Sequence, residues 1–396
     1  MIYIALDLGS DTIKVVAVRI TDKDFSILAS TNVRSVGIKK GIISDKAMVI
    51  ESLKLALNEI ENKLNIKIDK VILTIPSYEN NIISCHGEVE VNDEITGVDV
   101  INCFKSAINE IDDDYSEIVT VTPISFKVDG EKCNNPIGKK GKLLETQTII
   151  TLSPKELTTM YIDLLKEINV EVIDLSLNPI SDFYMVKKDE FKDNVGALVN
   201  IGDNKTEIGI FNKGLLVNSD ILTFGSNKID MDLKYVYNVD KNIARNIKDN
   251  FVVANHNYAQ NESIKITTLA GEEKTISSSE ASEVTEARIE DILKNVKNSL
   301  INLTKKDLSY IIITGGITNI PGFDYMVEQT FGDITYTENM NILGARDNIY
   351  ITSVGATMYY YDKLKTRGIS YTMYDNINNK DFSGILDNIK MFLGNN

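Results

Sequence analysis

Large aliphatic side chains recur at every second position near the start of the chain. Ile2, Ile4 and Leu6 form one such run, and residues 13–17 contain a second. A period of two residues is that of a β-strand. The polar turn over residues 9–11 separates the two runs. The first thirty residues therefore predict a strand, a tight turn and a second strand.

The next pattern has the period of a helix. Within residues 45–64, apolar side chains recur at steps of three and four behind a Ser44-Asp45 cap, which predicts an amphipathic helix. Residues 70–75 then form a short apolar run that ends at Pro76, as expected of a strand. Strands and helices that alternate in this way indicate an α/β fold.

The second half of the chain begins like the first. An apolar run at 197–199, a polar turn at 202–206 and another apolar run at 208–211 repeat the opening pattern. A further apolar run at 310–314 ends at a pair of glycines. The repeat predicts an internal duplication, with two similar lobes and a cleft between them.

These patterns divide the chain into six parts. Residues 84–162 differ in character from both lobes and predict a small α+β insertion, whereas the polar stretch near residue 370 predicts a linker. The predicted bounds are 1–83 and 163–192 for the first lobe, 84–162 for the insertion, 193–230 and 306–362 for the second lobe, 231–305 for its smaller subdomain, 363–379 for the linker and 380–396 for an amphipathic terminal segment.

Composition narrows the classes of function. The chain has 396 residues and a net charge of −15, from 57 acidic and 42 basic side chains, which argues against nucleic-acid binding. With two histidines, the chain cannot build a site that needs several imidazoles. Its three irregularly spaced cysteines fit neither a disulfide framework nor a zinc site. Neither a secretory leader nor an 18-residue apolar run occurs, so we expect the bulk of the protein in the cytoplasm.

Three glycine-containing turns, each directly after an apolar run, carry the candidate chemistry. In the first, at residues 7–14, Asp7 precedes backbone amides and hydroxyls. Such a turn suits a phosphate group whose metal ion is held by the aspartate, although a polar hairpin turn fits this motif equally well when it is taken alone. The other turns lie at 200–206 and 313–318. Together they predict two phosphate-binding turns and an adenosine-binding turn in one cleft.

These turns resemble those of the actin and Hsp70-like ATPase superfamily. Longer motifs are similar to one of its members, the FtsA family of bacterial cell-division proteins, over roughly residues 1–362, and the terminal segment resembles that family's membrane-targeting helix. The motifs that carry the resemblance are 121–130, 135–138 and 143–145 in the insertion, then Phe224-Gly225, Ala244 with Lys248, 286–290 and 353–356.

The resemblance implies an actin-like, two-lobed duplicated fold with ATP and Mg²⁺ in the cleft. It also implies filaments of this chain formed through the insertion, binding of the FtsZ C-terminal peptide by the 231–305 subdomain, and attachment to lipid on the inner face of the cytoplasmic membrane at the division site. By position, Asp7 would support the metal ion. The implied nucleotide-binding residues are Asp7, Gly9, Ser10, Thr12, Lys14, Gly202, Lys205, Thr206, Gly225, Lys248, Gly315, Gly316 and Thr318.

The second turn departs from the family's Asp-Ile-Gly-Gly-Gly. This chain has Asn200, Asp203 and Asn204 in place of the aspartate and two glycines. Asp203 brings a negative charge beside a polyanion, which weakens binding unless magnesium or Lys205 compensates. Asn200 lacks the carboxylate expected to organise metal and attacking water, and Arg245 replaces a glutamate that accepts from the ribose. We expect a partly degenerate nucleotide site with at most weak ATPase activity.

The terminal segment has one apolar stripe. At helical spacing it presents Phe382, Ile385, Leu386, Ile389, Phe392 and Leu393. A helix this short is unstable alone in water, so it docks on the protein's own body or lies in a lipid interface, and the family resemblance favours lipid. Its lysines are balanced by aspartates, so anionic lipid adds little attraction and a single tail binds the membrane weakly. A filament that carries many tails binds it firmly.

Two other functions stay open. A sugar or acetate kinase of the same superfamily needs a substrate-specific catalytic carboxylate, and no residue can be assigned to that role. A PilM-like pilus-assembly scaffold also has an inserted domain and a similar first turn, but it has no obvious use for the terminal stripe.

Overall fold

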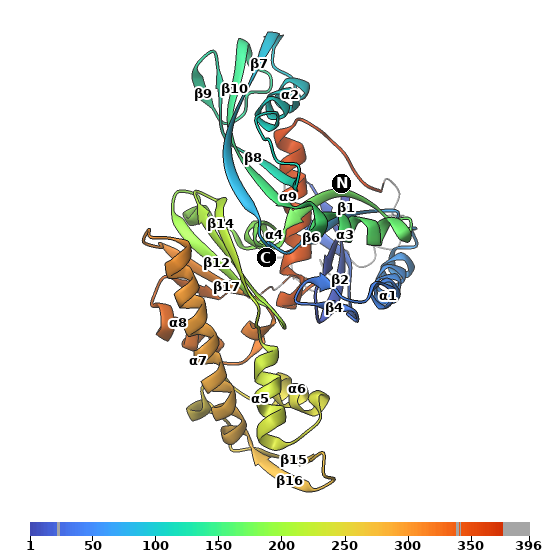
Figure 1. Ribbon diagram of the computed structural model, residues 1–396, viewed down its shortest axis with the longest axis vertical. Coiled ribbons are helices and arrows are strands. Elements are labelled where there is room, and N and C mark those ends of the chain that lie inside the picture. Colours follow the sequence, from blue (N-terminus) through green and yellow to red (C-terminus); the bar gives the residue numbers. More distant parts are fainter. Residues whose placement is uncertain (22–23, 338–339, 341, 375–396) are drawn as a thin grey trace, which may run out of the picture.

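The computed structural model describes residues 1–374 except 22–23, 338–339 and 341. The predicted membrane segment 380–396, with its stripe from Phe382 to Leu393, lies outside the described residues. Figure 1 shows an elongated molecule in which two lobes lie side by side, with the insertion at one end and the smaller subdomain of the second lobe at the other.

The first lobe is built on a sheet that has five strands in the described residues, in the order β11-β6-β1-β2-β3. Strands β1, β2 and β3 form an antiparallel meander, and β6 and β11 add to β1 in parallel. The hairpin predicted at the start of the chain is therefore confirmed. The strands are β1 (Ile2–Leu8), β2 (Thr12–Ile20), β3 (Phe25–Arg34), β6 (Lys70–Ile75) and β11 (Glu171–Leu177).

The second lobe repeats this topology. Its sheet has the order β14-β13-β12-β17-β18, again with an antiparallel meander followed by two parallel additions. The duplication predicted from the repeated pattern is thus present in the fold. The strands are β12 (Val195–Ile201), β13 (Thr206–Asn212), β14 (Leu215–Leu222), β17 (Tyr310–Thr314) and β18 (Thr335–Thr337).

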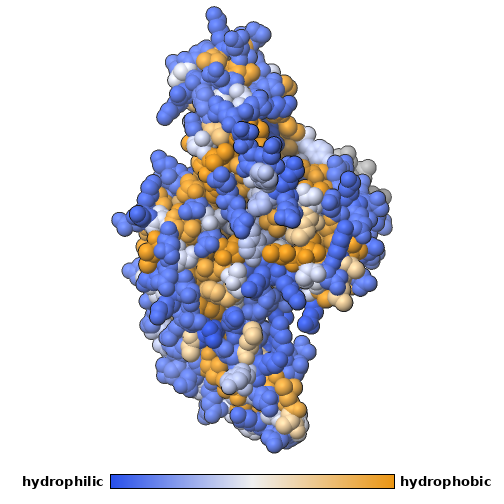
Figure 2. All heavy atoms as spheres, viewed as in Figure 1, coloured by the Kyte–Doolittle hydropathy of each residue, from blue (hydrophilic) through white to orange (hydrophobic). Residues whose placement is uncertain are grey.

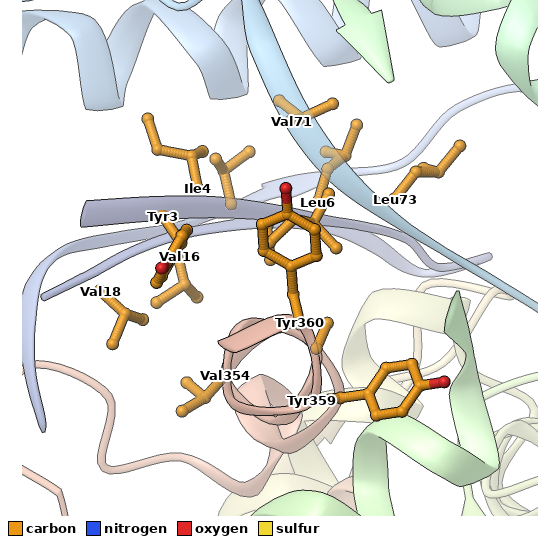
Figure 3. Close-up of a cluster of buried hydrophobic side chains, with 14 of the residues drawn as sticks. Tyr3, Ile4, Leu6, Val16, Val18, Val71, Leu73, Val354, Tyr359 and Tyr360 are labelled. Carbon is orange, nitrogen blue, oxygen red and sulfur yellow. The ribbon is translucent and has the colours of Figure 1, made fainter. Parts of the chain in front are cut away.

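Helix α9 (Ile351–Thr366) packs against the first sheet and also contacts helix α4 (Asn178–Val186). Figure 3 shows Tyr360 pointing at the sheet, whereas Tyr359 points away from it. The ring of Tyr359 meets that of Tyr184 on α4 edge-on, with centroids 4.9 Å apart. Aromatic pairs of this geometry add to the stabilisation from burial. Because β12 follows α4 in the chain, this packing joins the two lobes at the base of the cleft.

The predicted amphipathic helix is α1 (Lys46–Leu64), and Asp45 caps it by accepting from the backbone N–H of Met48 at 3.2 Å. The connecting elements are α3 (Lys155–Glu167), α8 (Phe323–Phe331), the short strands β4 (Ile38–Lys39) and β5 (Ile42–Ile43), and the 3-10 helices η1 (Asp189–Phe191), η2 (His256–Tyr258), η3 (Gly316–Asn319) and η4 (Asn348–Tyr350).

The insertion is a sheet of order β7-β10-β8-β9 covered by one helix, with a separate hydrophobic core. It runs from 81 to 154, whereas the sequence pattern predicted 84–162. The difference arises because α3 buries Tyr161, Leu164 and Leu165 in the core of the first lobe. The elements of the insertion are β7 (Asn81–Glu94), α2 (Gly97–Ile108), β8 (Ser116–Val128), β9 (Glu131–Cys133) and β10 (Lys140–Pro154).

The smaller subdomain of the second lobe is mainly helical, with one β-hairpin at its far end (Figure 1). Ser277 and Glu280 form a capping box at the start of its longest helix, a motif that satisfies the first free N–H groups of a helix. The elements are α5 (Asn227–Tyr237), α6 (Lys241–Asn250), β15 (Ser263–Thr267), β16 (Glu273–Ser277) and α7 (Ser278–Leu303).

The first part of the predicted linker 363–379 is ordered. Helix α9 continues to Thr366, and residues 371–374 then lie along the first sheet. The N–H of Met373 donates to the carbonyl of Ile2 at 3.1 Å, and the hydroxyl of Tyr374 accepts from the N–H of Lys70 at 3.1 Å. We call residues 371–374 the strap.

The surface is mostly hydrophilic, as the charged composition implies. On the face drawn in Figure 2, hydrophobic atoms occur at the neck where the insertion meets the two lobes, and in further groups over the lobes. Ile149 of the insertion, Ile180 of the first lobe and Leu215 of the second line a small cavity in this region. Side chains from three parts of the chain therefore meet at the neck.

Candidate functional site

A cavity of about 450 Å³ lies between the two lobes, within the usual volume of small-molecule sites. The three glycine turns meet there, one from the first lobe and two from the second. Thr206, Gly225 and Thr318 lie behind the wall of the cavity. The structure brings to the wall Asp7, Gly9, Ser10, Thr12, Lys14, Gly202, Lys205, Lys248, Gly315 and Gly316.

The first turn connects β1 to β2. Asp7 lies opposite Lys14 in the hairpin register, and its Oδ2 is 3.0 Å from the lysine Nζ. The hydroxyl of Ser10 accepts from the N–H of Gly41 at 2.8 Å, which ties the turn to the β4–β5 hairpin. The turn therefore presents an ion pair and backbone amides to the cavity.

The second turn, between β12 and β13, is supported from behind by Gly225. The N–H of Ser226 donates to the carbonyl of Gly202 at 2.9 Å. A Cβ at position 225 would lie 2.2 Å from that carbonyl oxygen, so only glycine permits the approach. Thr206 is fully buried and donates to the carbonyl of Phe224 at 2.9 Å. Gly225 and Thr206 therefore hold the shape of the turn.

The third turn follows β17. Gly315 has a φ of 99°, and a Cβ there would lie 2.3 Å from the carbonyl oxygen of Ile201. Thr318 donates its hydroxyl hydrogen to the carbonyl of Gly315 at 2.8 Å and accepts from the side-chain amide of Asn348 at 2.6 Å. The close approach of Gly315 to Ile201 sets the third turn against the second, and the Thr318 hydrogen bonds hold the third turn and tie it to Asn348.

A buried carboxylate that sequence reasoning missed lies at the base of the cleft. Asp182 on α4 is fully buried. It accepts from the side-chain amide of Asn200 at 2.7 Å and from the hydroxyl of Thr352 at 2.6 Å. Burial raises the pKa of Asp182 to about 7, against the opposing effect of these two hydrogen bonds. Asp182 thus joins α4, α9 and the second sheet.

Glu207 is a second buried carboxylate at this base. It accepts from the backbone N–H of Ser77 at 3.1 Å and from the side-chain amide of Asn178 at 2.6 Å, and it also pairs with Lys205. The carbonyl oxygen of the Asn178 side chain is buried without a hydrogen-bond partner among the described residues. Asn178 is itself one of the residues that line the cavity.

Arg245 on α6 connects both lobes at the mouth of the cavity. Its guanidinium lies 2.7 Å from Asp11 of the first turn and 2.7 Å from Asp203 of the second, and its Nε is 3.4 Å from Asp230. Burial lowers the pKa of Arg245, but the hydrogen bond and charge of Asp11 and the other two carboxylates more than offset this effect, so the pKa is raised. Lys248 lies 2.8 Å from Asp230. Arg245, which stands where the family has a ribose-accepting glutamate, therefore bridges the two lobes.

The comparisons with known proteins agree with this architecture. Residues 197–355 match the family model described as cell division protein FtsA, and residues 79–152 match the model of the SHS2 domain inserted in FtsA. The chain belongs to the FtsA family. The FtsA resemblance stated from the sequence is confirmed, and the matched inserted domain nearly coincides with the insertion.

Relatives of this FtsA-family chain are distant but cover most of it. It is 27% identical to the cell division protein FtsA of Bacillus subtilis over 376 residues, which are 93% of this chain and 85% of the relative. It is 26% identical to FtsA of Enterococcus hirae over 364 residues, 90% of this chain and 82% of the relative.

Solved structures show that the fold is actin-like. The crystal structure of MreB5 of Spiroplasma citri bound to AMPPNP has a TM-score of 0.55 at 16% identity, covering 92% of this chain and 97% of that one. The PilM-PilN type IV pilus biogenesis complex has a TM-score of 0.58 at 12% identity, covering 90% and 98%. At such identities these likenesses establish the fold alone. In the described part of this FtsA-family chain, no helix is long and apolar enough to cross a membrane.

Proposed function

We propose that this chain is an actin-like adaptor of bacterial cell division, which binds ATP in its cleft, polymerises and connects FtsZ to the inner face of the cytoplasmic membrane at the division site. The observation that carries the proposal is the convergence of the three glycine turns on one interlobe cavity in a chain of the FtsA family. Fold alone does not fix function, so the argument depends on these site residues.

The polar wall of the cavity supports a nucleoside triphosphate as ligand. The turns offer backbone amides, which bind phosphate oxygens. Lys14 and Lys205 line the same wall and supply positive charge. Ile317 and Ile320 line the side nearest the third turn, where an apolar surface suits an adenine ring.

The resemblance also implies a magnesium ion beside Asp7. Mg²⁺ prefers near-octahedral oxygen ligands from carboxylates and phosphates. The Asp7 carboxylate already contacts Lys14 at 3.0 Å, and position 200 offers an amide whose nitrogen donates to Asp182. These donors fit a magnesium ion poorly, and the proposed function assigns the ion no step.

We expect this protein to hydrolyse ATP slowly, if it binds ATP. Hydrolysis of ATP requires a group that orients the attacking water. Asp182 and Glu207, the carboxylates at the base of the cleft, accept hydrogen bonds from the protein's own side chains. A single-turnover assay with radiolabelled ATP tests this point, because rapid hydrolysis by the purified protein would contradict it.

For FtsZ, the candidate surface is a groove of about 370 Å³ that residues of α5 and α7 line, in the subdomain predicted to bind the partner. Tyr235 on its edge is 87% exposed. Arg288, another lining residue, is shared between Asp232 at 2.5 Å and Asp291 at 2.7 Å. A peptide with apolar side chains and a carboxylate fits this combination of an exposed ring and a guanidinium.

The partner proposal is tested with the C-terminal peptide of FtsZ. Fluorescence anisotropy should detect binding to the wild type, and Arg288→Glu should weaken it at least about tenfold, since a buried charge contact in an interface contributes more than about 1.4 kcal/mol. Lys294→Glu makes the same charge reversal at an exposed position of α7 and serves as the control. Equal affinity in both variants would reject the groove as the binding site.

Self-assembly is proposed through the insertion. Val98, Tyr115 and Ile124 are exposed there, with 64%, 87% and 46% of their surface accessible, and exposed apolar side chains of this kind mark contact surfaces. Sedimentation of the purified chain with and without residues 81–154 would test this assignment. Membrane attachment is proposed through residues 380–396 on the basis of their sequence pattern.

A further inference from the structure

Among the described residues, four cationic side chains line the interlobe cavity, and they are not equivalent. Arg245 is shared among three carboxylates, and Lys248 is paired with Asp230. Lys14 is paired with Asp7 across the first hairpin. Lys205 differs because its ammonium, which is paired with Glu207 of the second lobe, also lies beside Gly41 of the first lobe.

The Lys205 ammonium reaches from the second lobe to the first. A Cβ built on Gly41 would lie 3.3 Å from its Nζ, and the N–H of Gly41 donates to Ser10 of the first phosphate turn. The ammonium therefore lies close to both phosphate turns. Its side chain is only 13% exposed, so water screens its charge weakly.

Glu207 fixes the position of this ammonium. In the part of the chain that the structure describes, Glu207 is the hydrogen-bond partner of Lys205, and an ammonium has three N–H donors. Donors are thus left for phosphate oxygens. Glu207 is itself held by Ser77 and Asn178, so the lysine is oriented by a buried, hydrogen-bonded carboxylate.

The side chains at Asp7 and at position 200 explain why a divalent metal ion fits this cavity poorly. At Asp7 the Lys14 ammonium already occupies the carboxylate oxygen Oδ2, at 3.0 Å. At position 200 the amide nitrogen donates to Asp182, and the amide oxygen is turned toward the third turn, where it would lie 2.7 Å from a Cβ at Gly315. In the part of the chain that the structure describes, no three acidic, histidine or cysteine side chains are grouped so that they could hold a metal ion, and Mg²⁺ demands near-octahedral oxygen ligands.

We propose that Lys205 supplies the positive charge that a metal ion brings to related sites, so that this cleft binds a nucleoside triphosphate without requiring Mg²⁺. The inference rests on the proposed nucleotide-binding function. It assigns Lys205 as the residue that determines the metal requirement, and Glu207 as the residue that positions it.

The experiment is a titration of the full-length protein with ATP by isothermal calorimetry, in Mg²⁺ and in excess EDTA. The wild-type Kd should change by less than about threefold between the two buffers. Lys205→Ala should weaken binding in EDTA by at least about tenfold, the loss expected for one charge-assisted hydrogen bond. Lys294→Ala, which removes an exposed lysine on α7, should behave as the wild type.

Two further variants complete the test. Lys205→Gln keeps a polar side chain, one atom shorter and without the charge, and controls for misfolding if Lys205→Ala has a lowered Tm. Lys205→Ala combined with Asn200→Asp restores a carboxylate and should bind ATP in Mg²⁺ but not in EDTA.

The outcomes separate the inference from the function it rests on. Wild-type binding that falls more than about tenfold in EDTA overturns the role of Lys205 and leaves the nucleotide site standing. Equal affinities of the wild type and both Lys205 variants in EDTA also overturn it. If the wild type binds no ATP in either buffer, the proposed nucleotide function fails, and the inference fails with it.

Discussion

Removing the Arg245 guanidinium should loosen the contact between the two lobes. Its pair with Asp203 is largely shielded from water, with side chains 25% and 12% exposed, and a hydrogen bond between charged groups contributes about 1.5–3 kcal/mol. The pair with Asp11, which is 35% exposed, contributes at most about 1 kcal/mol. Lys248 still neutralises Asp230 in the variant. Arg245→Ala should therefore lower the free energy of unfolding by about 2–4 kcal/mol.

Calorimetry of the ligand-free protein measures this loss. An unfolding entropy near 2.1 cal/mol/K per residue gives about 0.8 kcal/mol/K for the chain, so Tm should fall by about 2–5 °C. Asp11→Asn removes only the exposed pair, so its smaller effect should disappear in about 1 M salt, where the Debye length is about 3 Å.

A distance measurement between spin labels on the two lobes adds a readout specific to the bridge. Arg245→Ala should broaden the distance distribution. Arg288→Ala removes an arginine that is paired only within one subdomain in the described structure, and it should leave the distribution unchanged. A Tm within about 1 °C of the wild type for Arg245→Ala, with an unchanged interlobe distance, would refute the reasoning.

Three further changes test other parts of the structure. The folded state raises the pKa of Asp182 to about 7, so its contribution to stability falls as pH rises from about 4 to 7; Asp182→Asn should flatten this part of a plot of Tm against pH, and an unchanged slope would contradict the assignment. Gly225→Ala places a Cβ 2.2 Å from a carbonyl oxygen, so it should lower Tm and abolish the thermal shift with ATP. The control is Gly316→Ala, whose Cβ meets nothing closer than 3.9 Å, and its Tm should stay within about 1 °C of the wild type. Deletion of 380–396 should leave Tm unchanged but abolish co-sedimentation with liposomes; continued pelleting with lipid would count against the membrane role.

The glycine turns could be predicted because each combines an apolar run with residues that favour a tight turn. Gly315 and Gly225 occupy positions where a side chain would collide with backbone, and such requirements leave a local signal in the sequence. The duplication was visible for the same reason, since alternating apolar residues specify each hairpin. These parts of the fold depend on short stretches of chain.

Asp182 and Glu207 could not be predicted in the same way. Each acquires its role from partners far away in the sequence, such as Thr352 for Asp182 and Ser77 for Glu207. Asp182 did leave one usable signal, because it is an acidic residue between Ile180 and Phe183 on the buried face of a helix, and buried carboxylates are rare without partners. The role of Arg245 depends on the closure of the cleft, which no local pattern encodes.

The ends of domains were also predicted poorly where tertiary packing decides them. Helix α3 follows the last strand of the insertion without a break, so its pattern alone did not assign it to the first lobe. The strap is polar and tyrosine-rich, which suggested a linker. Its backbone, however, pairs with Ile2 and accepts from the hydroxyl of Tyr3, and the hydroxyl of Tyr374 accepts from the N–H of Lys70.

The strap determines how mechanical load on the end of the chain would enter the body. Residues 371–374, where the described part of the chain ends, are hydrogen-bonded to the starts of β1 and β6. A pull applied at Tyr374 would act on these few bonds, at the sheet that also carries Asp7 and the first phosphate turn. Tension at the terminus and occupancy of the cleft would thus act on the same β-strand.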